Sequence, residues 1–293
     1  MSDKKAVIAL GYFDGAHKGH NAVIFSAIKE AERLFAIPVV FTFDGNLRGR
    51  LSGGKCIFTA SERAEILKEK GFAEILSAPV SDEFLSLSPA EFLDFINEKY
   101  DIKGYACGED YRFGKNGEGD VAFLKKYAAA KGQTVAVCSA VYEGGEKVSA
   151  TRIKNLLFNG EIDAANKLLS FDYFISGIVK SDRGVGRMLG FPTVNVNVDN
   201  DKSELKNGVY AGYAFVEGVK YAAVINYGNR PTYNLNEKLV EAHLIGFSGT
   251  LYGKTVRIYF TRFLRDIKKF DGEQELKSQL KKDVLNAKQG DNK

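Results

Sequence analysis

Residues 10–20 read Leu-Gly-Tyr-Phe-Asp-Gly-Ala-His-Lys-Gly-His, and this stretch decides how the first half of the chain folds. It follows an apolar run at 6–10 that has the length of a buried strand, and apolar residues then recur at helical spacing across 23–34. A strand, a glycine-rich turn and a helix in this order direct backbone N–H groups toward an anion. The stretch therefore predicts a phosphate-binding turn at the end of a β-strand.

The turn also holds His17 and His20, two of the three histidines in the chain, with Gly19 between them. At the start of a helix the two imidazoles can point the same way, and the glycine leaves room for a phosphate. Donors of this kind suit charge stabilisation on a phosphate chain during nucleotidyl transfer. The alternative is a tight turn that carries two solvated histidines.

Composition predicts an ordinary globular chain. At 293 residues it is long enough for two domains, and 41 basic against 37 acidic residues leave a net charge of +4, too mild to indicate a nucleic-acid partner. The cysteines Cys56, Cys107 and Cys138 form no C-x-x-C pair, which argues against a disulfide framework or a zinc site. No apolar run approaches a membrane span. These features predict a cytoplasmic protein without a membrane partner.

Strand and helix patterns alternate in the first half. Further apolar strands are expected at 37–43, 74–76, 105–107 and 134–137. Thr59 and Ser88 each open a helix with a capping box, and Asp120 caps another. Such alternation predicts an α/β domain with a parallel sheet, whose ligands bind beyond the carboxyl ends of the strands.

The pattern changes near residue 170, which we take as the domain boundary, with one domain at 1–169 and the other at 170–293. Short strands rich in Val, Ile, Tyr and Phe are expected at 174–179, 209–216, 221–227, 239–244 and 256–263. They predict a small antiparallel barrel or sandwich. Asp271 is expected to cap a final helix that starts at Gly272.

The motif G-x-F-D-G-x-H-x-G-H resembles the opening of the bacterial bifunctional riboflavin kinase/FAD synthetase family, and matching segments occur near both ends of the chain. The resemblance implies a Rossmann-like nucleotidylyltransferase domain followed by a riboflavin kinase barrel with a terminal helix. It implies ATP, riboflavin and FMN as substrates and Mg²⁺ as cofactor. The oligomeric state stays open.

The resemblance also implies site residues in the first domain. His17, His20 and Arg152 would act on the phosphates. ATP and FMN would be bound by Gly11, Phe13, Asp14, Gly19, Asn46, Gly108, Asp110, Arg112, Phe113, Ser149 and Thr151. Two positions depart from the family pattern: Asn46 stands where relatives carry a histidine, and Ala150 replaces a hydroxyl residue.

In the second domain, residues 186–195 resemble the kinase signature G-R-x-L-G-F-P-T-x-N. Thr193 and Asn195 stand two apart, so in an extended segment both face one side and could bind Mg²⁺. Glu241, in an E-x-H-L strand, is the implied base for the riboflavin 5′-hydroxyl. The remaining implied contacts to nucleotide or flavin are Gly186, Arg187, Gly190, Pro192, Asn226 and Arg230.

These patterns predict an enzyme that converts riboflavin to FMN and FMN to FAD. Asn46 and Ala150 suggest an alternative, a riboflavin kinase whose first domain has lost adenylylation. A regulatory flavin- or nucleotide-binding protein without turnover is a second alternative. Thr193, Asn195 and Glu241 argue against it, because binding alone needs no base.

Overall fold

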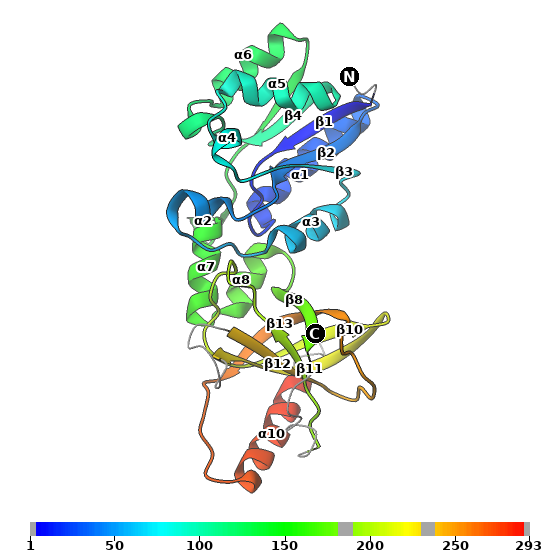
Figure 1. Ribbon diagram of the computed structural model, residues 1–293, viewed down its shortest axis with the longest axis vertical. Helices are drawn as coiled ribbons and strands as arrows, with labels where there is room; N and C mark the ends of the chain where they lie inside the picture. The colour runs from blue at the N-terminus through cyan, green and yellow to red at the C-terminus, as the bar shows by residue number, and fades with distance from the viewer. Residues whose placement is uncertain (1–3, 181–189, 230–237, 290–293) are drawn as a thin grey trace. The chain divides into compact units, whose positions relative to one another are not determined.

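The computed structural model of the protein describes residues 4–180, 190–229 and 238–289 (Figure 1). The chain forms two compact units, Met1–Ala150 and Thr151–Lys293. The first is an α/β unit and the second contains a β-barrel, so the predicted fold class is confirmed.

The first unit alternates strands and helices through most of its length. Its described elements, in chain order, are β1 (Lys5–Leu10), α1 (Lys18–Arg33), β2 (Ile37–Phe43), α2 (Leu47–Ser52), α3 (Ala60–Glu69), β3 (Glu74–Ala78), α4 (Asp82–Leu85), α5 (Pro89–Lys99), β4 (Asp101–Gly108), the 3-10 turn η1 (Lys115–Gly117), α6 (Val121–Ala130), β5 (Thr134–Cys138), β6 (Tyr142–Glu143) and β7 (Glu146–Lys147). The predicted capping boxes of α3 and α5 are both present, and the Asp120 side chain caps α6.

Among the described residues the main sheet has the strand order β3-β2-β1-β4-β5, and all neighbouring strands are parallel. The order reverses between β1 and β4. At such a reversal the loops after the two strands leave toward opposite faces and open a crevice. The loop after β1 is the histidine turn, and the loop after β4 begins at Glu109.

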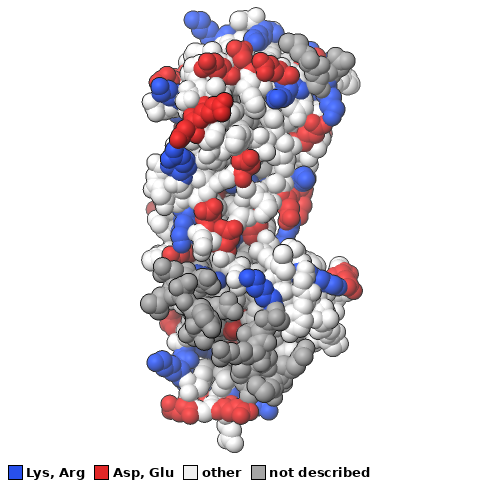
Figure 2. Space-filling model, viewed as in Figure 1, with Lys and Arg blue, Asp and Glu red and all other residues white. Residues whose placement is uncertain are grey.

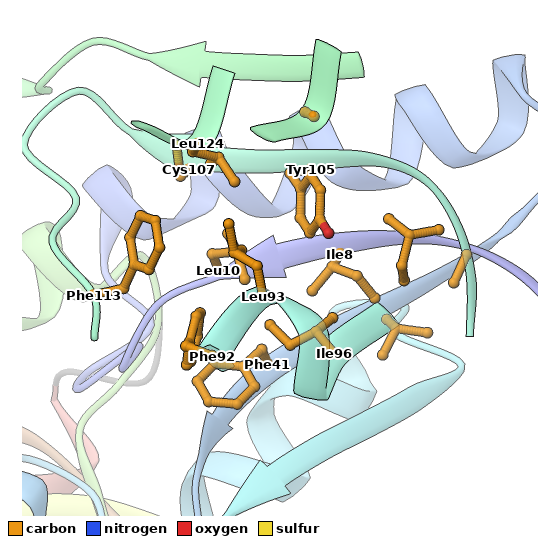
Figure 3. Close-up of a cluster of buried hydrophobic side chains, with 14 of the residues drawn as sticks. Ile8, Leu10, Phe41, Phe92, Leu93, Ile96, Tyr105, Cys107, Phe113 and Leu124 are labelled. Atoms are coloured by element: carbon orange, nitrogen blue, oxygen red, sulfur yellow. The ribbon is translucent and has the colours of Figure 1, made fainter. Parts of the chain in front are cut away.

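Helices cover both faces of this sheet, which explains why β1 is apolar at nearly every position. Ile8 and Leu10 point to one face, where they pack with Phe41, Phe92, Leu93, Tyr105 and Leu124 (Figure 3). Val7 and Ala9 point to the other face, against α1 and α3. A strand buried on both sides must be continuously hydrophobic, as parallel strands usually are.

The second unit begins with two helices and continues as strands. Its described elements are α7 (Ala150–Asn159), α8 (Ile162–Leu169), β8 (Phe174–Lys180), β9 (Val194–Asn197), β10 (Gly208–Val216), β11 (Val219–Asn229), β12 (Lys238–Leu244), β13 (Thr255–Arg265) and α10 (Glu273–Lys288). In the described part, the strands close into an antiparallel barrel in the order β10-β11-β12-β9-β8-β13. A barrel, rather than a sandwich, is thus the outcome.

Helix α10 covers the outside of the barrel. Ala287 packs with Val209, Ala211 and Val224 from β10 and β11. Asp283 is 1% exposed and accepts hydrogen bonds from both Nε and Nη2 of Arg265, the shortest at 2.7 Å. The predicted N-cap of this helix was wrong by one residue: Gly272 is the cap, and the backbone N–H of Asp271 donates to Glu275 Oε2 at 3.1 Å.

The compact units divide at 150/151, earlier than the predicted boundary at 169/170. Asn166 on α8 explains why the helix belongs with the barrel. Its Nδ2 donates to the carbonyl oxygen of Phe260 at 2.9 Å, and its Oδ1 accepts from the backbone of Tyr173 at 2.8 Å. Where the functional boundary falls stays a prediction.

One face of the molecule shows how its charged side chains are distributed. Acidic and basic side chains are interspersed on the face that Figure 2 shows, in keeping with the small net charge of +4. In the described parts of the chain, no helix combines the length and the apolar character that crossing a membrane requires.

Candidate active sites

A cavity of about 960 Å³ lies in the first unit, lined by the loops that follow β1 and β4. It unites most residues that the sequence assigned to nucleotide and FMN binding. Those that line it are Gly11, Phe13, Asp14, His17, Gly19, His20, Gly108, Asp110, Arg112, Phe113 and Ser149. Motifs about a hundred residues apart thus meet because the strand order reverses between β1 and β4.

The histidine turn holds an unusual backbone. Phe13 and Ala16 adopt positive φ angles of 55° and 40°, next to Gly15 at 90°. Left-handed conformations cost a non-glycine residue roughly 1–3 kcal/mol and cluster at functional sites. At Gly11 a Cβ atom would lie 2.9 Å from the Phe13 ring, so the turn can close only around a glycine.

The two histidines stack on each other with ring centroids 3.7 Å apart and an interplanar angle of 12°. His17 is the N-cap of α1, and its Nδ1 accepts a hydrogen bond from the backbone N–H of His20 at 3.3 Å. An acceptor nitrogen carries no proton, so neutral His17 is protonated on Nε2. The capping bond therefore makes Nε2 the hydrogen-bond donor of His17.

Both imidazoles are neutral at neutral pH. Burial lowers the pKa of His17 to about 4, and its side chain is only 6% exposed. Burial also holds the pKa of His20 well below its usual range, with His17 and Lys70 acting in the same direction. The pair thus offers hydrogen-bond donors rather than positive charge to a phosphate.

Other contacts fix the walls of this cavity. Asp14 accepts a hydrogen bond from the backbone of Ile57 at 2.7 Å and ties the histidine turn to the segment before α3. The β6–β7 hairpin is held by two ion pairs, Glu143 to Lys18 at 2.9 Å and Lys147 to Asp110 at 2.5 Å. The Lys147 ammonium lowers the pKa of Asp110, which is therefore charged.

Phe113 serves mainly the core. It is 5% exposed and packs against Phe92 at 5.4 Å between ring centroids, while Tyr111 stacks on it at 5.6 Å (Figure 3). Arg112 is exposed, with Nη1 3.9 Å from Asp120 Oδ2. A role for either residue against a flat ring stays a prediction.

Asn46 lies outside the set of cavity-lining residues and has a structural task. Its Oδ1 accepts from the backbone of Gly49 at 2.8 Å and so caps α2, and its Nδ2 donates to the carbonyl oxygen of Gly54 at 3.0 Å. Thr151 and Arg152 belong to α7 in the second compact unit. The predicted contacts of these three residues with phosphate stay predictions.

The sequence motifs missed several cavity residues, among them Arg48, Arg50 and Lys147. Arg48 and Arg50 lie on α2, a short helix without an apolar periodicity that could have revealed it. The only signal was Asn46 itself, because asparagine is a favoured helix N-cap.

A second polar site lies on the barrel. Glu241 in β12 is paired with Asn195 in β9 on one side and with Asn226 in β11 on the other. Paired residues of antiparallel strands point to the same face, so the three side chains form a row. Asn226 Nδ2 donates to Glu241 Oε2 at 3.4 Å. Val240 and Ala242 are buried, so Glu241 faces away from them as predicted.

Asn195 carries a buried oxygen that suits a cation. The residue is 6% exposed, and among the described residues no hydrogen-bond donor reaches its Oδ1. Thr193, two positions earlier, is half-buried. No group of three or more His, Cys, Asp or Glu in the described ranges could hold a metal ion by itself. An ion bound here would take the Oδ1 of Asn195 from the protein and further ligands from phosphate or water.

His243 is the histidine of the E-x-H-L motif, to which the sequence assigned no role. Its Nδ1 lies 2.8 Å from the carbonyl oxygen of Pro192, and its ring meets Phe191 edge-on at 5.3 Å. It thereby fixes the backbone that leads into Thr193. Gly190 is described, with a φ of 85°, whereas the predicted residues Gly186, Arg187 and Arg230 lie outside the described residues.

Two family models match the chain, FAD synthetase over residues 1–152 and riboflavin kinase over residues 169–290. The bifunctional riboflavin kinase/FMN adenylyltransferase of Bacillus subtilis (strain 168) is 33% identical over 290 residues, covering 97% of this chain and 92% of that protein. The chain belongs to this family. The resemblance predicted from the sequence motifs is confirmed.

Other comparisons cover the same length of chain. The Escherichia coli (strain K12) bifunctional riboflavin kinase/FMN adenylyltransferase is 30% identical over 289 residues, covering 97% of this chain and 92% of that protein. The crystal structure of a macrolide-efflux protein from Streptococcus pneumoniae is 30% identical, with a TM-score of 0.86 over 98% of this chain and 95% of that one. Riboflavin kinase and FMN adenylyltransferase are the two activities of the family to which this chain belongs.

Proposed function

We propose that this chain phosphorylates riboflavin on its barrel and adenylylates the resulting FMN at the cavity of its α/β unit. The observation that carries the proposal is that both sets of polar residues assemble, one row on the barrel and one cavity beyond β1 and β4. ATP would serve both reactions, giving ADP in the first and pyrophosphate in the second.

In the kinase reaction Glu241 accepts the proton of the riboflavin 5′-hydroxyl as its oxygen attacks the γ-phosphorus of ATP. The hydrogen bond from Asn226 holds one carboxylate oxygen in place, at 3.4 Å. Thr193 and Asn195 would hold Mg²⁺, and the buried Oδ1 of Asn195 fits that role. Bound Mg²⁺ supplies neutralisation of the phosphate charge in both reactions.

In the adenylylation reaction an FMN phosphate oxygen attacks the α-phosphorus of ATP, and the bond to the pyrophosphate oxygen breaks. The Nε2–H of His17 donates to the phosphate chain, where negative charge develops. His20 stacks beneath it and fixes the ring orientation. Positioning and preorganised donors would supply most of the acceleration, because the protein forms no covalent bond to the substrate in this scheme.

A riboflavin kinase without adenylylation was the alternative suggested by Asn46 and Ala150. The side chain of Asn46 caps α2 instead of lining the cavity, so this residue is a weaker argument for a loss of adenylylation. The cavity retains the histidine pair and several basic side chains. We therefore propose that both activities are present.

Two variants test the division of labour. Full-length protein is incubated with riboflavin, ATP and Mg²⁺, and the flavins are separated by chromatography. Glu241→Gln removes the base and should slow FMN formation by about 10²–10⁴-fold, while supplied FMN still becomes FAD. His20→Ala should instead slow FAD formation by roughly 10²–10³-fold and let FMN accumulate.

The crossed pattern is the decisive result. A folded His20→Ala protein that no longer forms FMN would contradict separate sites. If both variants formed FMN and FAD at the rates of the parent protein, Glu241 and His20 would have structural roles only. A parent protein that forms FMN but never FAD would favour the kinase-only alternative.

A further inference from the structure

The cavity needs positive charge that its histidines do not supply. ATP brings a triphosphate into a site where both imidazoles are neutral, since burial lowers the pKa of His17 to about 4 and that of His20 well below its usual range. Asn46 is uncharged and caps α2. Beside the Mg²⁺ that accompanies ATP, cationic side chains elsewhere on the cavity wall are the groups that can compensate the phosphates.

Most cations on the wall already have carboxylate partners. The Arg50 guanidinium donates to the Asp82 carboxylate, Lys147 lies 2.5 Å from Asp110, and Arg112 lies 3.9 Å from Asp120. Arg48 is exposed and lines the cavity, and within the described part of the chain it forms no ion pair. Lys115 shares these properties but comes from the loop after β4, where its backbone N–H donates to the carbonyl oxygen of Leu87 at 2.7 Å.

Contacts of Arg63 fix the loop that leads into α2. Arg63 is 1% exposed, stacks on the Tyr12 ring at 4.5 Å and donates to the carbonyl oxygens of Phe43 and Gly45. The loop that leads into α2 is thus tied to the histidine turn through Tyr12. Asn46 then fixes the first turn of the helix that carries Arg48.

We propose that Arg48 binds the pyrophosphate end of ATP, the leaving group of the adenylylation reaction. The inference rests on the proposed adenylylation function and assigns Arg48 the charge that the histidines lack. A guanidinium forms bidentate, charge-assisted hydrogen bonds to phosphate.

Pyrophosphorolysis isolates this contact, because FAD plus pyrophosphate returns FMN plus ATP at the adenylylation site alone. In full-length protein, Arg48→Met should raise the KM for pyrophosphate about 10- to 100-fold, the range for a lost charge-assisted hydrogen bond. The KM for FAD and the rate of riboflavin phosphorylation should stay at parent values. Arg48→Lys should recover part of the loss, since it restores charge without the bidentate geometry.

Arg50→Met and Lys115→Met are the matched controls, because each removes one positive charge from the same cavity wall. Both should keep the KM for pyrophosphate within about threefold of the parent. An equal rise of the KM for pyrophosphate in Lys115→Met would show a general charge effect and overturn the assignment. A KM for pyrophosphate in Arg48→Met equal to that of the parent would overturn it too.

Calorimetric titration with inorganic pyrophosphate separates this inference from the proposed function. If the parent neither forms FAD nor runs the reverse reaction, the function is wrong, yet weaker pyrophosphate binding by Arg48→Met would still support the contact. Equal pyrophosphate binding by parent and Arg48→Met would overturn the contact whatever the activity.

Discussion

Acid should weaken the first unit through His17, and the size of the effect follows from its burial. The pKa of His17 is lowered to about 4, whereas an unfolded histidine titrates near 6.5. Below pH 6.5 His17 binds a proton in the unfolded chain but not in the folded chain. The stabilising contribution of neutral His17 is therefore fully present above this pH and is lost as the pH falls toward 4. Between pH 7 and pH 5 the linkage amounts to about 2 kcal/mol.

The three cysteines allow this loss to be measured for one unit alone. Cys56, Cys107 and Cys138 all lie in the first compact unit, and Cys56 and Cys107 are buried. Labelling with 4,4′-dithiodipyridine, which still reacts at pH 5, should report unfolding of this unit across a urea series at pH 7, 6 and 5. The labelling of the half-buried Cys138 is measured without urea and subtracted from the total.

The variant His17→Asn should remove about 2 kcal/mol of this pH dependence. Asparagine is a good helix N-cap, so the cap of α1 is kept while the titrating ring is removed. His243→Asn, in the barrel, deletes an imidazole from the other unit and should leave the pH dependence of labelling as in the parent. If parent and His17→Asn lost the same stability between pH 7 and pH 5, the neutral, buried state of His17 would be refuted.

Three further predictions test other parts of the structure. Asn226→Leu removes the hydrogen-bond donor to Glu241 and should lower kcat for FMN formation about tenfold, with little change in the KM for ATP. An unchanged kcat would show that Asn226 does not position Glu241. Asp283→Asn breaks the buried ion pair with Arg265 and should destabilise the barrel unit by about 3 kcal/mol. Amide hydrogen exchange in α10 should then be faster than in the parent protein. An exchange rate in α10 equal to that of the parent would disprove this prediction. Asn46→His replaces the cap of α2, so it should cost about 1 kcal/mol and should not speed FAD formation; a faster conversion of supplied FMN would restore its predicted place at the phosphates.

Sequence patterns predicted the elements that depend on local chemistry. The apolar runs that became β1 and β2, the capping boxes at Thr59 and Ser88, and the change to short strands after residue 170 each carry a signal within a few residues. Strand β9 had only a four-residue apolar alternation after a proline, so it was expected as an extended segment and emerged as part of the barrel wall.

What depends on long-range contact could not be predicted in this way. Asn46 was expected at the phosphates because of its place in a motif, but its partners Gly49 and Gly54 turn it into a helix cap. Phe113 was expected beside a ligand, but its ring packs against Phe92 of α5 in the core. In each case the motif located the loop correctly, while the packing partner decided the task of the side chain.

The neutral histidine pair shows how such packing changes the chemistry of a motif. Two charged imidazoles stacked 3.7 Å apart would repel each other, so the close stack itself requires that at least one be neutral. Burial makes both neutral, and the cap at Nδ1 then leaves His17 a single donor, at Nε2. A site built this way separates two tasks that a charged histidine would combine. In the scheme proposed above, the histidines supply directional hydrogen bonds, and the guanidinium of Arg48 supplies positive charge.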